Sequence, residues 1–254
     1  MIRLRSRNPM FSQIDRGLTS DGVSECTYTG VSIKTLILVV LAFASAGVAA
    51  YMLHNLTEDS IGIFMGVLFA SSFVAFICVV IASLIPRIAV VPSIIYALSM
   101  GFFLGVLSAL AEWALAMPGL AAMAVLITFT IFGVTLALYT SRVIRVGRFF
   151  RKFMMIAMFS LLVFMLIVMV SRFFTPTLSD VVFGNGGIGI AFSLIFILFG
   201  ALMLIFDFDR IEAYVTNGAD KKFEWPLALG LMVTLVWIYV EVLRLLIILA
   251  SRRK

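Results

Sequence analysis

Hydrophobic residues gather along the chain in seven long runs that are separated by short polar segments. A helix needs about 20 mostly apolar residues to cross the hydrocarbon core of a bilayer, and each run is close to that length. The pattern therefore predicts an all-α integral membrane protein with a bundle of seven transmembrane helices. The predicted helices lie at about 33–53, 61–85, 88–111, 115–140, 153–171, 187–206 and 226–250.

The runs divide the chain into three parts. Residues 1–31 are polar and are predicted to form a cytoplasmic tail, because a signal peptide would need an apolar core soon after its first charges. Residues 32–251 are predicted to form the transmembrane domain, and 252–254 a basic C-terminal tail. Between the second and third runs Pro86 and Arg87 predict a turn. Proline disfavours helical geometry in the residue before it, and arginine is costly in lipid.

Composition agrees with a membrane protein and excludes a single soluble core. Of the 254 residues 63% are hydrophobic and 13% are charged, whereas a soluble domain is about a quarter charged. The single histidine, His54, and the two cysteines, Cys26 and Cys78, have no neighbours at the spacing of a metal site. The sequence therefore predicts neither an enzyme nor a bound cofactor.

The positive charges predict the orientation of the helices. Lys and Arg are enriched in the cytoplasmic loops of membrane proteins, and with the N-terminus inside, 14 of the 19 basic residues fall on that side. We ascribe the net charge of +6 to these loops and expect no nucleic-acid partner. The expected topology is seven crossings with the C-terminus outside. A last segment that re-enters on the cytoplasmic side is the alternative, which the basic residues at 252–254 favour.

The candidate functional residues are charges in or beside the apolar runs, because such charges usually face a cavity or a partner. Asp207 ends the sixth run, and Glu241 lies deep in the seventh. Arg244 follows Glu241 by three residues, so the two share a helix face and can neutralise each other. Asp209 is two residues after Asp207, so these acids point in roughly opposite directions on a helix. Arg87 stands at the cytoplasmic start of the third run.

The depths of Asp207 and Glu241 allow a contact between them. With Gly218 as a helix stop and Pro226 in the first turn of the last helix, their depths differ by about four residues, or roughly 6 Å. Side chains tilt toward the N-terminus of their helix, which brings two acids of an antiparallel pair together. The alternative is that each acid separately meets a backbone group, a water molecule or an arginine.

Three segments of the sequence resemble motifs of the transmembrane Bax inhibitor motif family, especially its longer bacterial members. Ser6-Arg-Asn-Pro-Met-Phe is similar to the Ser-x-Asn-Pro-x-Phe opening of those bacterial proteins. Phe206-Asp-Phe-Asp-Arg-Ile is similar to the family's Tyr-Asp-Thr-Gln-x-Ile at the end of the sixth span. Ile238-Tyr-Val-Glu-Val-Leu-Arg is similar to its Leu-Tyr-Leu-Asp-x-x-Asn in the seventh.

The resemblance implies a bundle with a central last helix and a pH-sensitive calcium leak in a bacterial inner membrane. Carried over by position, the two acids that share a proton and gate the leak are Asp207 and Glu241, which are also the candidate calcium ligands. The arginine that pairs with the sixth-span acid is Arg87. Asp209 and Arg244 stand where the family has Gln and Asn, so they are auxiliary charges whose presence bears on ion selectivity and gating pH.

Two other functions fit the same sequence. A membrane regulatory protein without transport activity would bind a protein partner through its basic cytoplasmic face. A proton-coupled cation transporter would use the same acids, Asp207 and Glu241, but would move protons against the cation. Ion flux into vesicles that contain the purified protein distinguishes these functions. In each of them the lipid bilayer is the first partner, and in the channel and the transporter the ions are calcium and protons.

Overall fold

The fold is known from a computed structural model that describes residues 25–55, 61–144, 146–174, 182, 184 and 186–252. In this part of the chain the residues form seven long apolar helices, each long enough to cross a membrane, and two short 3-10 helices. The predicted all-α fold is therefore confirmed. In chain order the elements are α2 (Tyr28–His54), α3 (Ile61–Leu84), η2 (Pro86–Ile88), α4 (Val90–Leu115), α5 (Leu120–Thr140), α6 (Arg148–Phe174), α8 (Gly187–Thr216), η3 (Lys221–Phe223) and α9 (Glu224–Ser251).

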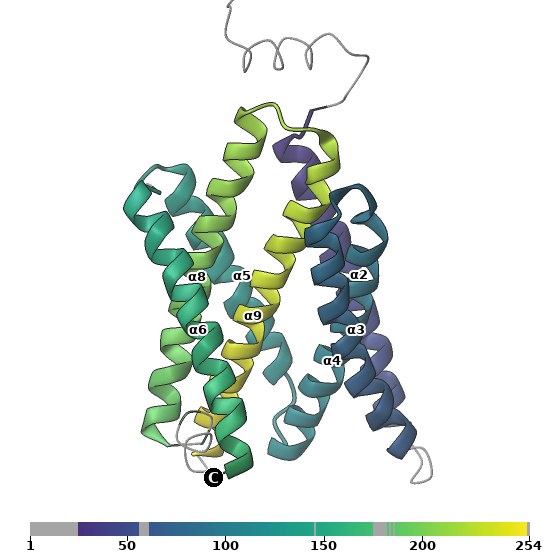
Figure 1. Cartoon of the computed structure of the whole chain (residues 1–254). Helices are drawn as coiled ribbons and strands as arrows, with labels where there is room; N and C mark the ends of the chain where they lie inside the picture. Colours follow the sequence, from purple (N-terminus) through teal and green to yellow (C-terminus); the bar gives the residue numbers. More distant parts are fainter. Residues whose placement is uncertain are drawn as a thin grey trace, which may run out of the picture.

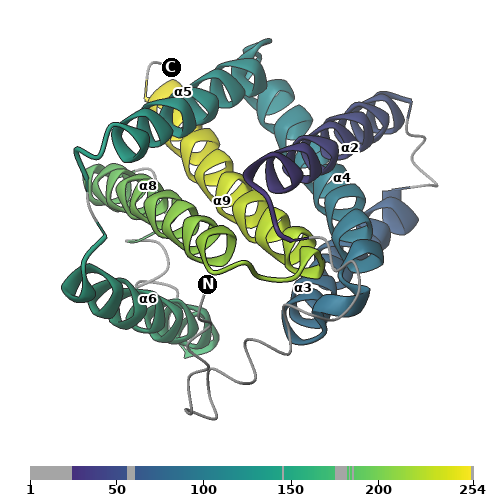
Figure 2. The same cartoon turned by 90° about the horizontal axis from the view of Figure 1, so that it is seen from above.

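The last helix, α9, occupies the centre of the bundle, as the resemblance implied (Figure 2). It packs against α2, α3, α4, α5 and α8. Buried residues make up 56% of its most apolar window, which is the highest share among the seven helices. Side chains on α9 therefore lie close to several helices, and the polar contacts described below depend on this central position.

The described helices place four segments at one end of the bundle. The start of α2, η2, the connection between α5 and α6, and η3 lie there, and we call it the basic end because it carries Arg87, Arg142, Arg151, Lys221 and Lys222 (Figure 1). The α4–α5 turn and the end of α9 lie at the opposite end. The start of α2 and the end of α9 are thus separated by the full length of the bundle. This is the arrangement expected for seven crossings.

Helix ends differ from the predicted ones by up to ten residues. Helix α4 continues to Leu115, where Ala116 in a left-handed conformation (φ 50°) ends it. Helix α8 continues to Thr216 rather than ending at 206. The predicted bounds followed the apolar runs, but a helix can extend beyond the lipid when its polar side chains have partners. The turn predicted at Pro86 and Arg87 is present, as η2.

Small residues bring α2 and α4 into close contact. The Gly-x-x-x-Gly pattern of Gly101 and Gly105 permits two helix backbones to approach each other. A Cβ atom built on Gly101 would lie 2.6 Å from the Cα atom of Ala42, and one on Gly105 would lie 2.6 Å from the Cα atom of Ala46. No larger side chain fits at either glycine without a shift of α2. The pattern therefore fixes α2 on the central bundle.

Candidate functional site along the central helix

Polar side chains are spread along α9 and meet partners on different helices. Three of them, Glu224, Thr234 and Glu241, are buried. Thr234 is ten residues and Glu241 seventeen residues after Glu224, so they lie roughly 15 Å and 26 Å further along the helix axis. The helix thus presents polar groups at three depths, from the basic end toward the opposite end.

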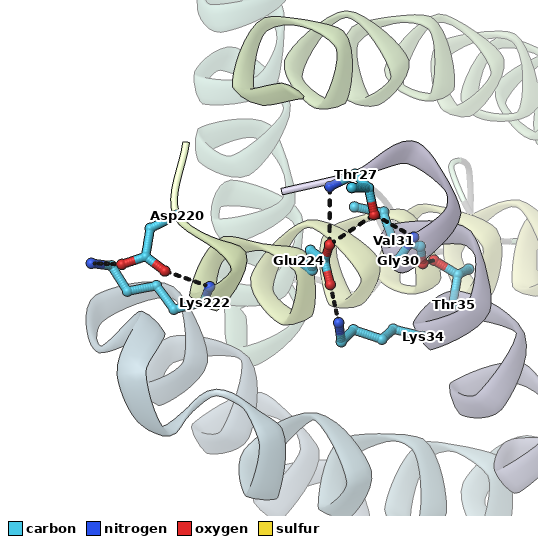
Figure 3. Close-up of polar contacts among 8 residues, drawn as sticks. All are labelled: Thr27, Gly30, Val31, Lys34, Thr35, Asp220, Lys222 and Glu224. Carbon is cyan, nitrogen blue, oxygen red and sulfur yellow. Dashed lines mark hydrogen bonds and ion pairs between the residues drawn. The ribbon is translucent and has the colours of Figure 1, made fainter. Parts of the chain in front are cut away.

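The first of these groups is a buried ion pair that joins the first and last described helices (Figure 3). The Glu224 carboxylate is fully buried and forms a salt bridge with the Lys34 ammonium group of α2. It also accepts hydrogen bonds from the Thr27 backbone N–H at 2.9 Å and from the Thr27 hydroxyl at 3.1 Å. Thr27 is the N-cap residue of α2, because its hydroxyl accepts a hydrogen bond from the Gly30 N–H at 3.0 Å.

Backbone contacts extend this junction to the loop before α9. The Cys26 N–H donates a hydrogen bond to the Ala219 carbonyl at 2.7 Å, and Glu25 and Asp220 form an antiparallel β-bridge. Burial raises the pKa of the Cys26 thiol. Gly30 leaves the space that the Glu224 carboxylate occupies, since a Cβ atom there would collide with it. The start of α2 is therefore fixed to the start of α9 by main-chain and side-chain contacts together.

The second group pairs Asp207 of α8 with Thr234 of α9. Asp207 is buried, with 7% of its surface exposed, and its Oδ2 atom accepts a hydrogen bond from the Thr234 hydroxyl at 2.6 Å. The position of α9 that faces this sixth-span acid is therefore occupied by a hydroxyl group. A neutral hydroxyl can donate one hydrogen bond to the carboxyl group, but it cannot neutralise its charge.

The third group contains Glu241 and Arg244, which the sequence predicted to share one helix face. Arg244 Nη2 lies 3.4 Å from Glu241 Oε2, and Arg244 Nε donates a hydrogen bond to the Ser193 hydroxyl of α8 at 3.0 Å. The guanidinium group also lies over the ring of Phe196, 5.6 Å from its centroid. The predicted pair is therefore present, and Arg244 connects it to α8.

The other acids of α8 lie at the outside of the bundle, near the basic end. Asp209 accepts two hydrogen bonds from the Arg151 guanidinium group of α6, at 3.0 Å and 3.2 Å. Glu212 binds the Tyr139 hydroxyl of α5 and lies 2.9 Å from Arg142. Asp209 thus points away from the interior, whereas Asp207 points into it, as their spacing predicted. The sequence predicted Asp209 as an auxiliary charge, whereas Glu212 was not among the predicted residues.

Arg87 lies at the basic end in η2, with its side chain exposed to the surroundings of the bundle. The segment η2 packs against η3, which follows Asp220. Hydrogen bonds from Lys222 hold the pKa of Asp220 below its usual value, and the charge of Arg87 acts in the same direction. The structure therefore places Arg87 beside the loop between α8 and α9, and it does not bring Arg87 to Asp207.

The structure also does not bring Asp207 and Glu241 together. Asp207 is nine residues before the end of α8 (216 − 207), whereas Glu241 is seventeen residues after the start of α9 (241 − 224). The difference of eight residues corresponds to roughly 12 Å, in place of the roughly 6 Å that we predicted. The prediction counted residues in the last helix from Pro226 and residues in the preceding helix up to Gly218. In the structure α9 begins at Glu224 and α8 ends at Thr216. Each acid instead has its own partner, which was the alternative.

The separation of Asp207 and Glu241 also bears on the prediction that they are calcium ligands. Calcium prefers six to eight oxygen ligands, and Asp207 and Glu241 lie too far apart to hold one ion between them. In the described part of the chain, no three His, Cys, Asp or Glu side chains gather in a group that could bind a metal ion. The two carboxylates could therefore contact a cation one after the other, each with water molecules as the remaining ligands.

Sequence reasoning missed Glu224 and Thr234. Glu224 stands at the edge of the last apolar run, where a charge is usually assigned to the water interface, and its partner Lys34 was assigned to the cytoplasmic charges. A helical threonine usually bonds the carbonyl four residues earlier, and Thr234 is at 3.3 Å from the Gly230 carbonyl. The one signal for either residue is its place on the last helix, which the resemblance placed at the centre of the bundle.

The comparisons with known proteins agree with this architecture. Residues 8–251 match the model of the family described as Bax inhibitor 1 like. The match spans nearly the whole chain, so the chain belongs to this family, and the resemblance inferred from the three motifs is confirmed. No curated protein and no solved structure matches the chain. The chain is thus an integral membrane protein of the Bax inhibitor-like family with seven candidate spans.

Proposed function

We propose that this member of the Bax inhibitor 1-like family forms a pH-sensitive leak for calcium ions, with Asp207 and Glu241 as its proton-sensing groups. The observation that carries the proposal is the burial of both carboxyl groups, one on α8 and one on α9, inside a bundle of candidate membrane spans. A buried carboxyl group is costly to ionise unless a partner neutralises it. Its protonation state is therefore coupled to the arrangement of the two helices.

The two acids would act differently, because their partners differ. When Asp207 loses its proton, its charge faces the neutral Thr234 hydroxyl and needs water or a cation. Glu241 already faces the cationic Arg244. Protonation of Glu241 would remove the negative charge that Arg244 faces and so change the position of the guanidinium group that bonds Ser193 of α8. Proton loss at Asp207 and proton gain at Glu241 are thus the two events that would disturb the packing of α8 on α9.

Direct sharing of one proton by Asp207 and Glu241 belongs to a second helix arrangement in this proposal. In the described structure Asp207 contacts Thr234, which is seven residues or roughly 10 Å along α9 from Glu241. A shift of α8 along α9 by about two turns would bring the two carboxyl groups together. In that arrangement the shared proton would join the helices at low pH, and its loss at higher pH would separate them.

Calcium flux into vesicles tests the proposed leak. The purified protein is incorporated into vesicles that contain a calcium indicator, and calcium entry is followed from acidic to neutral pH. We expect entry above that of empty vesicles, with a clear dependence on pH. Entry equal to that of empty vesicles at every pH would contradict the leak and favour a regulatory role. Movement of protons against the cation would indicate a coupled transporter.

Substitution of the two acids tests their role in the pH dependence. Asp207→Asn and Glu241→Gln remove the titratable groups with little change in shape, and each should abolish or strongly shift the pH profile of flux. Asp209→Asn is the matched control on α8, since Asp209 is paired with Arg151 at the outside. If the acids share a proton, the shifts of the two single variants will not add in the double variant. Unchanged profiles in both single variants would assign the acids a structural role.

A further inference from the structure

A cavity of about 280 Å³ lies between α2, α4, α5 and α9. It is separate from the Asp207–Thr234 and Glu241–Arg244 contacts, because none of these four residues lines it. Its walls are mostly formed by Ala, Gly, Val, Leu and Phe side chains, and small residues on α2 and α4 leave much of the space. An apolar cavity of about 150 Å³ can hold a benzene molecule, so this one has room for a longer apolar group. The cavity runs along the side of the central helix toward the α4–α5 turn, where Glu112 and Ala121 line it.

The polar groups in the wall of this cavity are already bonded to protein groups. The Ser108 and Tyr239 hydroxyls lie 2.6 Å apart, and the Thr128 hydroxyl donates to the Ala124 carbonyl at 2.8 Å. The Glu112 carboxylate accepts hydrogen bonds from two backbone N–H groups of the α4–α5 turn, at 3.1 Å and 2.9 Å. A water molecule needs two to four polar partners to occupy a buried site. The cavity therefore favours an apolar occupant over water.

One side of the cavity faces the outside of the bundle. The helix pairs α2–α4, α4–α9 and α5–α9 pack against each other and close three sides. On the fourth side α2 and α5 meet through the stacked rings of Phe43 and Phe129, whose centroids are 6.3 Å apart. These rings line the cavity, yet they are 48% and 42% exposed. Figure 2 shows α2 and α5 on the same side of α9, so this seam opens toward the surrounding lipid.

The end of the cavity at the α4–α5 turn carries a negative charge. Glu112 lies there, next to Trp113, which is 83% exposed. Tryptophan is enriched at the level of the lipid head groups, so the turn marks the membrane surface. The Arg and Lys residues of the basic end lie at the far end of the bundle (Figure 1). An anionic head group above this turn would be repelled by Glu112, whereas a zwitterionic one carries a cation that Glu112 attracts.

We propose that this cavity binds one acyl chain of a zwitterionic phospholipid, which enters between α2 and α5 with its head group at the α4–α5 turn. Acyl chains of the bilayer lie beside the seam. The polar groups in the cavity wall are already bonded to protein groups, so they do not favour water over an acyl chain. The volume of about 280 Å³ fits part of one chain and not a whole lipid. The inference does not depend on the proposed leak, because its residues and its test are independent of Asp207 and Glu241.

Photochemical labelling with a modified lipid tests the proposal. The full chain is incorporated into phosphatidylcholine vesicles with a small fraction of phosphatidylcholine that carries a diazirine in the middle of one acyl chain. After irradiation the labelled residues are identified by mass spectrometry. Met232 and Leu235 of α9 line the cavity and are only 4% and 7% exposed, so bulk lipid cannot reach them from outside. We expect adducts on these two residues.

Filling the cavity should remove this labelling. Ala109→Phe places a large side chain in the cavity, and adducts on α9 should fall about tenfold. This is the loss of affinity expected when roughly two methylene groups of the acyl chain can no longer be buried there. Ala114→Phe is the matched control, because Ala114 lies on the same helix but is exposed. Ala122→Phe at the exposed edge of the cavity gives a second test that disturbs the core less.

Three results would overturn the binding of an acyl chain in this cavity, and a fourth would overturn the choice of head group. The first is the absence of adducts on Met232 and Leu235 in a folded wild-type protein. The second is equal labelling of these residues in Ala122→Phe and in wild type. The third is labelling by a water-soluble diazirine, which would show that water fills the cavity. Equal labelling by a phosphatidylglycerol probe of the same chain length would overturn the assignment of a zwitterionic head group.

Discussion

Helices α9 and α6 have similar lengths, 28 and 27 residues, but opposite positions in the bundle. The most apolar window of α9 is 56% buried, whereas that of α6 is only 11% buried, although the window of α6 is the more apolar of the two. Helix α9 packs against five other helices, and α6 packs against α8. In water the more apolar helix would be expected in the core, but in a bilayer the surrounding lipid is as apolar as the core.

The two helices also differ in how they are held. Helix α9 has buried polar contacts with α2 through Glu224 and with α8 through Thr234 and Arg244. Helix α6 is joined to α8 by the Arg151–Asp209 pair at the basic end and by the stacked rings of Phe164 and Phe192, 5.9 Å apart. Buried polar groups and close packing therefore mark the central helix, whereas apolarity alone marks the lipid-facing one.

The largest expected effect comes from the junction of α9 with α2. Glu224→Gln removes the counter-charge of Lys34, which is 15% exposed, and the loss of one partner of a buried pair costs about 3–5 kcal/mol of unfolding free energy. A thiol-reactive dye that follows the thermal exposure of the buried Cys78 in detergent, in a Cys26→Ser background, measures the change. Asp220→Asn, in an exposed pair with Lys222 at the same end, is the control and should leave the transition almost unchanged. Equal behaviour of the two variants would show that the buried pair does not hold α9.

A smaller effect is expected from the close packing of α8 on α9. In Gly200→Ala the new Cβ atom would lie 2.6 Å from Ile238 Cγ1, and such overpacking costs about 1–3 kcal/mol. Gly133→Ala on α5 is the matched control, since no neighbouring atom lies within 4 Å of its Cβ position. That control should be neutral or stabilising by up to about 1 kcal/mol, because alanine favours helices. If both variants melted alike, the close contact of α8 and α9 would not contribute to stability.

The smallest effect is expected at α6. Arg151→Gln removes a salt bridge whose arginine side chain is 51% exposed, and pairs of this kind contribute less than about 1 kcal/mol. We expect almost unchanged melting but a broader distribution of distances between spin labels on α6 and α8. Lys152→Gln, at an exposed neighbouring position, should leave that distribution unchanged. A large loss of stability in Arg151→Gln would reverse the ranking of the two helices.

The local features of this fold could be predicted from the sequence. The lengths of the apolar runs predicted seven spans, and Pro86 and Arg87 predicted the turn before α4. The pair of Glu241 and Arg244 was also predictable, because residues three apart share a face of any helix. Each of these inferences depends on neighbouring residues, whose geometry the helix itself determines.

The partners of the buried acids could not be predicted in the same way. Asp207 meets Thr234, 27 residues away, because the loop and η3 between the two helices set their relative depth. An error of a few residues at the helix ends was enough to suggest Glu241 as its partner. Glu224 and Lys34 are 190 residues apart, and their contact depends on the central position of α9. The packing of all seven helices determines that position.

The contact between Lys34 and Glu224 also constrains the order in which the protein is assembled. A ribosome adds about 5–20 residues per second, so the 190 residues that separate the two side chains take roughly 10 to 40 s to synthesise. During that time Lys34 and the Thr27 N–H group must be hydrated or bound to something other than their final partner. Helix α2 is thus synthesised well before α9, the helix whose contact completes its placement.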